Sequence, residues 1–229
     1  MVCPTLSHVD DTRLTVVVGH FGSGKTEFAI NLALALRQTR PRVALADLDV
    51  VDPYFRSREC EPMLQEKGIR LISSAPTCHD ADLPSMPAEV NTLTDDKTLW
   101  GVLDIGGDPS GARVLARYRR ALQSGDCRVL CVINANRPLS DTAEKTVAYL
   151  RSIETACGMK VDGLVNNTHC CHLTELGDIL HGAEMAQQVS QMTGIPIFCH
   201  AVPQQLADAA CQQLDRVFPL ELYMKKPWE

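Results

Sequence analysis

A glycine-rich stretch near the N-terminus carries the residue types that bind phosphate. Residues 19–26 read Gly-His-Phe-Gly-Ser-Gly-Lys-Thr and fit the pattern G-x-x-x-x-G-K-[ST]. In this phosphate loop, backbone N–H groups converge on phosphate oxygens, Lys25 reaches the outer phosphates, and the Thr26 hydroxyl binds Mg²⁺. The stretch therefore predicts a nucleoside-triphosphate site. Its nucleotide-binding residues are expected to be Gly19, His20, Phe21, Gly22, Ser23, Gly24, Lys25, Thr26 and Glu27.

The flanks of the phosphate loop are those that such a loop requires. A strand-like apolar run, residues 14–18, enters it, and a run of helix formers, residues 27–36, leaves it. The alternative is a tight strand-to-helix turn with a chance lysine, and the four fixed positions together with both flanks argue against it. A dinucleotide-binding loop is excluded, because the glycines do not form G-x-G-x-x-G.

Three acids follow the second predicted strand, residues 42–46. Asp47, Asp49 and Asp52 come directly after it. Because the carboxyl ends of parallel strands meet at one edge of a sheet, we expect these carboxylates near the phosphate loop. One can bind Mg²⁺ through water, and another can orient the water that attacks the γ-phosphate. The alternative is that they only cap a turn before Pro53.

Another acid, Asp104, ends the apolar run of residues 98–103 and is followed by Gly106, Gly107 and Asp108. An acid at the tip of a buried strand is the second acidic element of a phosphate-loop enzyme, where it polarises Mg²⁺ through its water shell. The paired glycines let the backbone approach the γ-phosphate and change conformation when that phosphate leaves. The alternative is an aspartate that caps the next helix.

The chain of 229 residues alternates strand-like and helix-like runs, without a repeat or a linker. Further strands are expected at 69–72, 128–133, 161–165 and 195–199, and helices at 57–67, 87–93, 110–123, from about 141, and at 176–192. This alternation predicts a single-domain α/β P-loop fold, with a mostly parallel twisted sheet of about seven strands and helices on both faces. Residues 1–13 are expected to form a flexible tail.

Composition limits the function classes. Hydrophobic residues at 45% and charged residues at 22% are typical of a globular protein in water, and the net charge of −6 argues against nucleic acid as a partner. The N-terminus has no apolar segment of a signal peptide, and no apolar run approaches the ~20 residues of a membrane span. We therefore expect a cytoplasmic protein that does not bind a membrane.

Two stretches have no assigned role. Residues 73–87 lack periodicity, and a loop of that length is usually functional or mobile, as a substrate or a partner surface. The ten cysteines form no C-x-x-C pair, which removes the usual zinc-ribbon and ferredoxin patterns. His169-Cys170-Cys171-His172 follows a strand, where adjacent side chains point opposite ways, so metal binding there is the weaker alternative.

Together these residues resemble the MinD/ParA branch of the SIMIBI-class P-loop ATPases, which also contains the CobQ/CobB-type enzymes. By this resemblance residues 19–26 are Walker A, and Asp47-Leu48-Asp49 is the D-x-D motif of switch I, in which Asp49 orients the catalytic water. Residues 104–108 resemble Walker B running into switch II. The predicted catalytic residues are then Lys25, Asp49 and Asp104, and the predicted metal ligands are Thr26, Asp49 and Asp104.

The resemblance also implies a base site and an oligomer. Asn166 is similar to the asparagine that recognises adenine, and Pro203 and Gln204 to the loop beside the base. Members of the family often form homodimers that enclose ATP. The residues 166–169, Asn-Asn-Thr-His, lack the N-K-x-D aspartate that pairs with guanine, so ATP is favoured over GTP.

The sequence departs from the family at one functional position. The signature lysine that reaches the nucleotide across the dimer is replaced by His20, which is followed by Phe21. An imidazole is shorter and largely neutral at pH 7, so dimerisation through this contact is in doubt. We hypothesise that Arg56 or Arg58 supplies the missing charge near the γ-phosphate. The alternative is that both are exposed arginines at the start of a helix.

The sequence thus predicts a Mg²⁺-dependent ATPase whose hydrolysis moves two switch segments, residues 49–58 and 104–110, to control a partner protein. The predicted switch residues are Asp47, Asp52, Arg56, Arg58, Gly106, Gly107 and Asp108. A second reading is an ATP-dependent synthetase or kinase of the CobQ/CobB or dethiobiotin-synthase type that acts on a small molecule. A third is a non-catalytic, ATP-gated scaffold.

Overall fold

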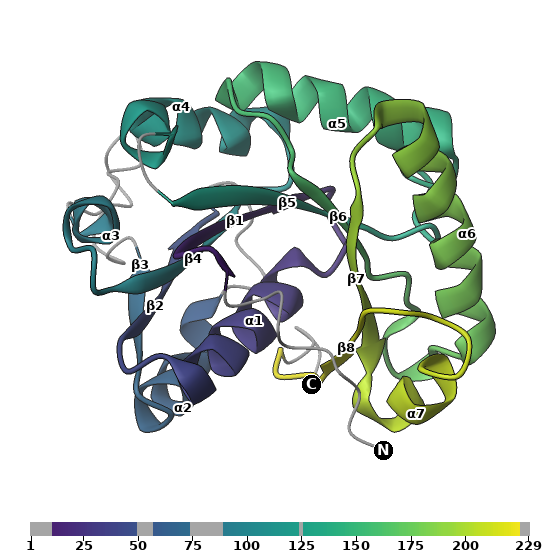
Figure 1. Ribbon diagram of the computed structural model, residues 1–229, viewed down its shortest axis with the longest axis horizontal. Helices are drawn as coiled ribbons and strands as arrows, with labels where there is room; N and C mark the ends of the chain where they lie inside the picture. Colours follow the sequence, from purple (N-terminus) through teal and green to yellow (C-terminus); the bar gives the residue numbers. More distant parts are fainter. Residues whose placement is uncertain (1–10, 50–56, 74–88, 124–125, 225–229) are drawn as a thin grey trace.

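The computed structural model describes residues 11–49, 57–73, 89–123 and 126–224 (Figure 1). Its strands are β1 (Leu14–Gly19), β2 (Val43–Leu48), β3 (Ile69–Ser73), β4 (Trp100–Ile105), β5 (Cys127–Ile133), β6 (Gly163–Asn166), β7 (Ile197–Pro203) and β8 (Val217–Leu220). Its helices are α1 (Lys25–Thr39), α2 (Glu61–Glu66), α3 (Val90–Asp95), α4 (Pro109–Gln123), α5 (Ala143–Cys157), α6 (Leu176–Thr193) and α7 (Ala207–Ala210). Short 3₁₀ turns lie at Ser57–Cys60, Cys171–Leu173 and Gln204–Leu206.

The strands form one parallel sheet with the order β3-β2-β4-β1-β5-β6-β7-β8. From β1 the chain runs outward to β2 and β3, returns to β4 beside β1, and then continues on the other side with β5 to β8. The strand order therefore reverses at β1. In open α/β sheets, ligands bind at the carboxyl ends of the strands beside such a reversal, which here is the end of β1 that leads into the phosphate loop.

Helices cover both faces of the sheet (Figure 1). Alternate residues of β1 supply the two cores, since Val16 and Val18 pack in a cluster with residues of α3, α4, α5 and α6, while Val17 packs with residues of α1 and α2. Because α1 is buried along most of its length, the helix that follows the phosphate loop is fixed against the sheet. None of the helices in the described parts of the chain combines the length and the apolar composition needed to cross a bilayer.

The observed sheet confirms the predicted fold and corrects its detail. It has eight strands and is parallel throughout, where about seven strands in a mostly parallel sheet were expected. The additional strand, β8, is four residues long and contains Pro219, a residue that strands accept at a sheet edge. The predicted strand before Asp104 extends through Ile105, so Asp104 lies within β4 and not beyond its end.

The boundary of the predicted N-terminal tail also needs correction. We placed residues 1–13 in the tail, but Arg13 is buried. Its backbone N–H donates to Asp126 Oδ2 at 2.9 Å, and its Nη1 donates to the carbonyls of Leu93 at 2.7 Å and Leu99 at 2.8 Å. This arginine therefore ties the entry of β1 to α3 and to the α3–β4 connection.

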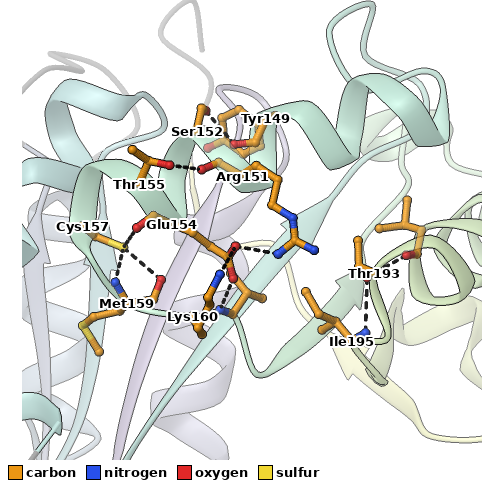
Figure 2. A network of polar contacts seen from close by, with 12 residues as sticks. Tyr149, Arg151, Ser152, Glu154, Thr155, Cys157, Met159, Lys160, Thr193 and Ile195 are labelled. Atoms are coloured by element: carbon orange, nitrogen blue, oxygen red, sulfur yellow. Dashed lines mark hydrogen bonds and ion pairs between the residues drawn. The ribbon is translucent and has the colours of Figure 1, made fainter.

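A polar network holds the C-terminal half of α5 (Figure 2). The Glu154 carboxylate accepts from Arg151 at 2.7 Å, from Lys160 at 3.2 Å and from the Val161 backbone N–H at 3.1 Å. Burial by itself would raise the pKa of Glu154, but these donors outweigh it and hold the pKa below its ordinary value. The network fixes α5 to the segment that leads into β6.

Candidate functional site

The phosphate loop connects β1 to α1 in a conformation that glycine makes accessible. Gly22 and Gly24 have φ values of +75° and +79°, in the left-handed region that side chains disfavour. The Ser23 N–H donates to the His20 carbonyl at 3.0 Å and closes a turn inside the loop. Because Gly24 precedes the first residue of α1, the unpaired N–H groups and the positive end of this helix lie at the end of the loop.

The lysine of the loop meets an acid from the end of β2. Lys25 Nζ lies 3.2 Å from Asp49 Oδ2, and both side chains are only 7% exposed. The Asp49 N–H donates to Asp47 Oδ1 at 3.3 Å, so the turn after β2 holds both acids near the loop. The structure thus brings together the lysine and two of the three acids predicted from the sequence. The third, Asp52, lies outside the described residues.

The threonine of the loop meets the acid of β4. Thr26 Oγ1 donates to Asp104 Oδ2 at 2.6 Å, while Asp104 Oδ1 is buried with no hydrogen-bond partner in the part of the chain that the structure describes. Burial raises the pKa of Asp104 to about 7; Lys25 and the Thr26 hydroxyl act against this rise, and Asp47 and Asp49 add to it. Asp104 therefore lies among carboxylates with one oxygen that no described donor satisfies.

These oxygen atoms fit a hard divalent cation. Mg²⁺ is usually held by one or two carboxylates together with waters and substrate phosphates. The Thr26 hydroxyl and the unsatisfied oxygen of Asp104 are donors of this kind, with Asp49 close to the same lysine. No group of three or more His, Cys, Asp or Glu side chains suited to a metal ion occurs among the residues described, and these include His169 to His172.

The other side of the loop is held by residues that the sequence analysis did not assign. The Gly22 carbonyl accepts from Asn134 Nδ2 at 3.3 Å and from Arg137 Nε at 3.0 Å. The Ser23 carbonyl accepts from Asn167 Nδ2 at 2.8 Å. These donors follow β5 and β6 at the carboxyl edge of the sheet. The acids were predicted from their position just after a strand, and the same criterion would select these three donors. No motif, however, distinguishes an asparagine at such a position from an ordinary turn residue.

His169 lies against the end of the loop. Its Nδ1 accepts from the Cys171 N–H at 3.2 Å, so the neutral ring carries its proton on Nε2. That Nε2 is buried without a partner among the described residues, and a methyl group on Gly24 would come within 3.1 Å of it. Burial, with a further contribution from Arg137, lowers the pKa of His169 to about 4, so the imidazole is neutral at pH 7.

The residues expected to contact the nucleotide base lie at the carboxyl edge of the sheet, but the side chain of Asn166 already forms hydrogen bonds within the protein. Asn166 is 0% exposed, and its Nδ2 donates to the Ile179 carbonyl at 3.0 Å and pairs with His200 Nδ1 at 3.1 Å. Its Oδ1 accepts from both the N–H and the hydroxyl of Thr168. Base recognition by Asn166 stays a prediction that would require exchanging these bonds. Pro203 ends β7, and the exposed Gln204 follows it.

Glu27, the last residue of the predicted nucleotide-binding stretch, turns to the C-terminal segment. Its carboxylate accepts the backbone N–H groups of Tyr223 and Met224. Burial raises the pKa of Glu27 in spite of these two bonds. One turn later Asn31 exchanges two hydrogen bonds with the backbone of Glu221, at 2.9 and 3.0 Å. The side chain of Glu27 therefore attaches the C-terminal segment to the start of α1.

The predicted switch residues are described only in part. Asp108 Oδ1 accepts the Gly111 N–H at 2.6 Å, so Asp108, and not Asp104, caps the start of α4. Gly106 packs beside Asp49, since a methyl group there would lie 3.0 Å from Asp49 Oδ1. Arg56 and the side chain of Arg58 lie outside the described residues, so the proposal that either supplies a positive charge stays a prediction.

Comparisons with known proteins identify the fold. A search of protein-family models and a search of curated proteins both found no match. The structure is similar to chloroplast FtsY from Physcomitrella patens, at 19% identity and a TM-score of 0.54, over 81% of this chain and 57% of that one. It is also similar to the cell division protein FtsY from Thermotoga maritima, at 20% identity and a TM-score of 0.55, over 83% and 62%.

A third similar structure is the signal recognition particle 54 kDa protein from Aeropyrum pernix K1 in complex with GDP, at 16% identity and a TM-score of 0.52. It is matched over 83% of this chain and 41% of its own, so the chain spans between 41% and 62% of the length of these three proteins. At such identities the likeness shows the fold. The expected P-loop NTPase-like α/β fold is confirmed, and membership of the SIMIBI class and of its MinD/ParA branch stays a prediction.

Proposed function

We propose that the chain binds a nucleoside triphosphate with Mg²⁺ at residues 19–26 and hydrolyses it as a switch that controls a partner protein. One observation carries the proposal. The phosphate-loop threonine and the β4 acid meet at 2.6 Å, and the acid keeps a buried oxygen without a described partner. A hydroxyl and a carboxylate in this arrangement beside a glycine-rich loop are the donors that hold Mg²⁺ in P-loop NTPases.

Each of the central side chains has a role in this reaction. Lys25 exchanges its contact with Asp49 for the outer phosphate oxygens and compensates their charge. Asp49, released from the lysine, accepts a hydrogen bond from the attacking water and orients it toward the γ-phosphate. Thr26 and Asp104 would hold the cation, which would supply positive charge against the charge developing on the phosphate oxygens. The N–H groups of the loop and of the α1 N-terminus bind the remaining oxygens.

We propose ATP as the nucleotide, because residues 166–169 lack the aspartate that pairs with guanine. GTP is the second candidate, and it is supported by the GDP bound to the similar Aeropyrum pernix protein. Competition of unlabelled ATP and GTP against a fluorescent nucleotide tests this choice. A preference for ATP of at least about tenfold, or about 1.4 kcal/mol, is expected, and the reverse preference would overturn the assignment.

Two other functions remain distinguishable by simple assays. A synthetase or kinase would release phosphate only when its small-molecule substrate is added, and a scaffold would bind nucleotide without releasing phosphate. Slow release of phosphate from Mg²⁺-ATP alone is expected for the proposed switch.

We further propose that a homodimer enclosing the nucleotide would not depend on residue 20, because His20 is in contact with Tyr149 of its own chain, with ring centroids 4.9 Å apart.

The variant Lys25→Ala tests the phosphate site directly. Loss of the Lys25 ammonium is expected to weaken nucleotide affinity about 100-fold or more, because charge-assisted contacts in buried sites contribute several kcal/mol. Isothermal titration calorimetry measures this effect. The matched control is Lys97→Ala, an exposed lysine whose Nζ donates to the Thr94 carbonyl away from the loop. Equal affinities of Lys25→Ala and the control would refute the proposed site.

A further inference from the structure

The segment Gly106–Gly107 touches the phosphate loop directly. A methyl group in place of a Gly107 hydrogen would lie 2.8 Å from the Phe21 nitrogen and 3.1 Å from the Gly19 oxygen. The first distance is too short for a carbon atom and the second is unusually tight, so glycine is the residue that allows this approach. The backbone of the second switch segment therefore rests on the backbone of the phosphate loop, and neither can move far without affecting the other.

One side chain from α5 contacts both of these segments. Tyr149 donates its hydroxyl to the Gly107 carbonyl at 3.2 Å, and its ring lies against the His20 ring, with centroids 4.9 Å apart and planes at 52°. Burial, with smaller contributions from Cys131, Asp108 and Asp49, raises the pKa of Tyr149. The hydroxyl therefore stays protonated at neutral pH and remains a donor.

The helix that carries Tyr149 is fixed at both ends. At its start the Thr142 hydroxyl accepts from the Lys145 N–H and caps the helix. Toward its end the Ser152 hydroxyl donates to the Tyr149 carbonyl at 2.6 Å, and the network around Glu154 follows (Figure 2). The phenol therefore projects from a rigid support toward two loops, so its hydroxyl defines where the Gly107 carbonyl can lie.

We propose that Tyr149 is a positioning residue that couples position 20 of the phosphate loop to the Gly106–Gly107 segment. The inference rests on the proposed function and names a regulatory contact of the same site. Because a peptide group is planar and trans, a hydrogen bond to the Gly107 carbonyl also fixes the direction of the Asp108 N–H. Loss of the bond frees this peptide to rotate, and the segment then spends less time in the geometry that hydrolysis requires.

Tyr149→Phe is the variant that tests the contact. It removes the hydroxyl and retains the ring against His20. Because one net hydrogen bond is lost, we expect kcat for phosphate release to fall about 5-fold, while nucleotide affinity changes less than about 2-fold. Amide hydrogen exchange in residues 104–111 should become faster, measured by mass spectrometry. A purely structural role would lower stability without this split between kcat and affinity.

The matched control is Tyr118→Phe, which removes a hydroxyl from a buried tyrosine of α4 that packs in the same hydrophobic cluster. It should leave kcat and exchange in residues 104–111 unchanged. Unchanged kcat and exchange in Tyr149→Phe, with Lys25→Ala still weakening nucleotide binding, would overturn the coupling and leave the proposed function intact. Nucleotide affinity that is insensitive to Lys25→Ala would remove the proposed function, and the coupling with it.

Discussion

The two sides of the phosphate loop differ in how completely their polar groups are satisfied. On the β5–β6 side, Asn134, Arg137 and Asn167 each donate to a loop carbonyl. On the β2–β4 side, acids crowd together, the pKa of Asp104 is raised to about 7, and its Oδ1 has no described partner. The first side thus supports the loop carbonyls without a ligand, although His169 Nε2 there also has no described partner. Since buried polar groups are normally paired, the crowded acids of the second side call for a ligand that brings positive charge.

The largest effect is expected on the unsatisfied side. Asp104→Asn keeps the shape of the side chain and an acceptor for Thr26 but removes the carboxylate. We expect Mg²⁺-dependent phosphate release to fall about 100-fold or more, as for other lost electrostatic contacts to a transition state. The free energy of unfolding should stay constant or rise, because a buried acid without full hydrogen bonding is removed.

Phosphate-release kinetics and urea denaturation of the same Asp104→Asn preparation measure both quantities. A clear loss of stability together with wild-type turnover would contradict the assignment of Asp104 to the cation. Such a result would mean that Asp104 supports the structure of the loop, as the side chains on the β5–β6 side do, and does not hold the cation.

The satisfied side should show the reverse pattern. Asn167→Ala leaves the Ser23 carbonyl without its buried donor, which costs about 1–3 kcal/mol of folding free energy. Nucleotide affinity should fall about tenfold with or without Mg²⁺, because the loop loses a support and not a ligand. Urea denaturation and calorimetry with and without the metal measure these effects.

Asn136→Ala is the matched control for Asn167→Ala. Asn136 is exposed and bonds to Cys170 and Asp178, away from the loop carbonyls. Its stability should change by less than about 0.5 kcal/mol, as is usual for surface substitutions. A metal-dependent loss of affinity in Asn167→Ala, absent from the control, would show that this asparagine takes part in binding and not only in support.

The two sides also differ in how far the sequence could predict them. Lys25 and Thr26 follow from a local pattern, and Asp104 from its place after an apolar run, because each signal lies within a few residues. Asn134 and Arg137 reach the loop across more than 100 residues of sequence, and nothing local records such a contact. The parallel sheet was predictable from alternation, whereas β8 was missed because four residues with a proline show no period.

Two neighbouring asparagines at the end of β6 make different polar contacts. The resemblance selects Asn166 for base recognition, which stays a prediction, and neighbouring side chains at the end of a strand point to opposite faces. The amide of Asn166 is directed toward α6, where it bonds to the Ile179 carbonyl, and Asn167 is directed toward the loop. Sequence alone predicts that polar residues gather at this edge, but the side to which each one points depends on the register of the strand.

The prediction with the smallest expected effect tests whether burial alone explains the raised pKa of Asp104. Glu154 is also a buried carboxylate, yet its pKa is lowered, because donors from Arg151, Val161 and Lys160 outweigh burial. Glu154→Gln keeps an acceptor and loses the charge-assisted bonds, so we expect a loss of about 1–2 kcal/mol at neutral pH. If hydrogen-bond donors, and not burial, determine the pKa values of the two acids, the loss of stability in Glu154→Gln must depend on the charge of the carboxylate.

The sign of that dependence follows from linkage. A carboxyl whose pKa is lower in the folded state contributes stability above its unfolded pKa, and this stability is lost as the pH falls through the folded pKa. The stability difference between wild type and Glu154→Gln should therefore be full at about pH 7 and shrink as the pH falls below the unperturbed pKa of about 4.3, as urea denaturation at each pH would measure. A difference that persists in acid would mean that the shape of the side chain, and not its charge, holds α5. The number of donors to each carboxylate would then no longer explain why the pKa of Asp104 differs from that of Glu154.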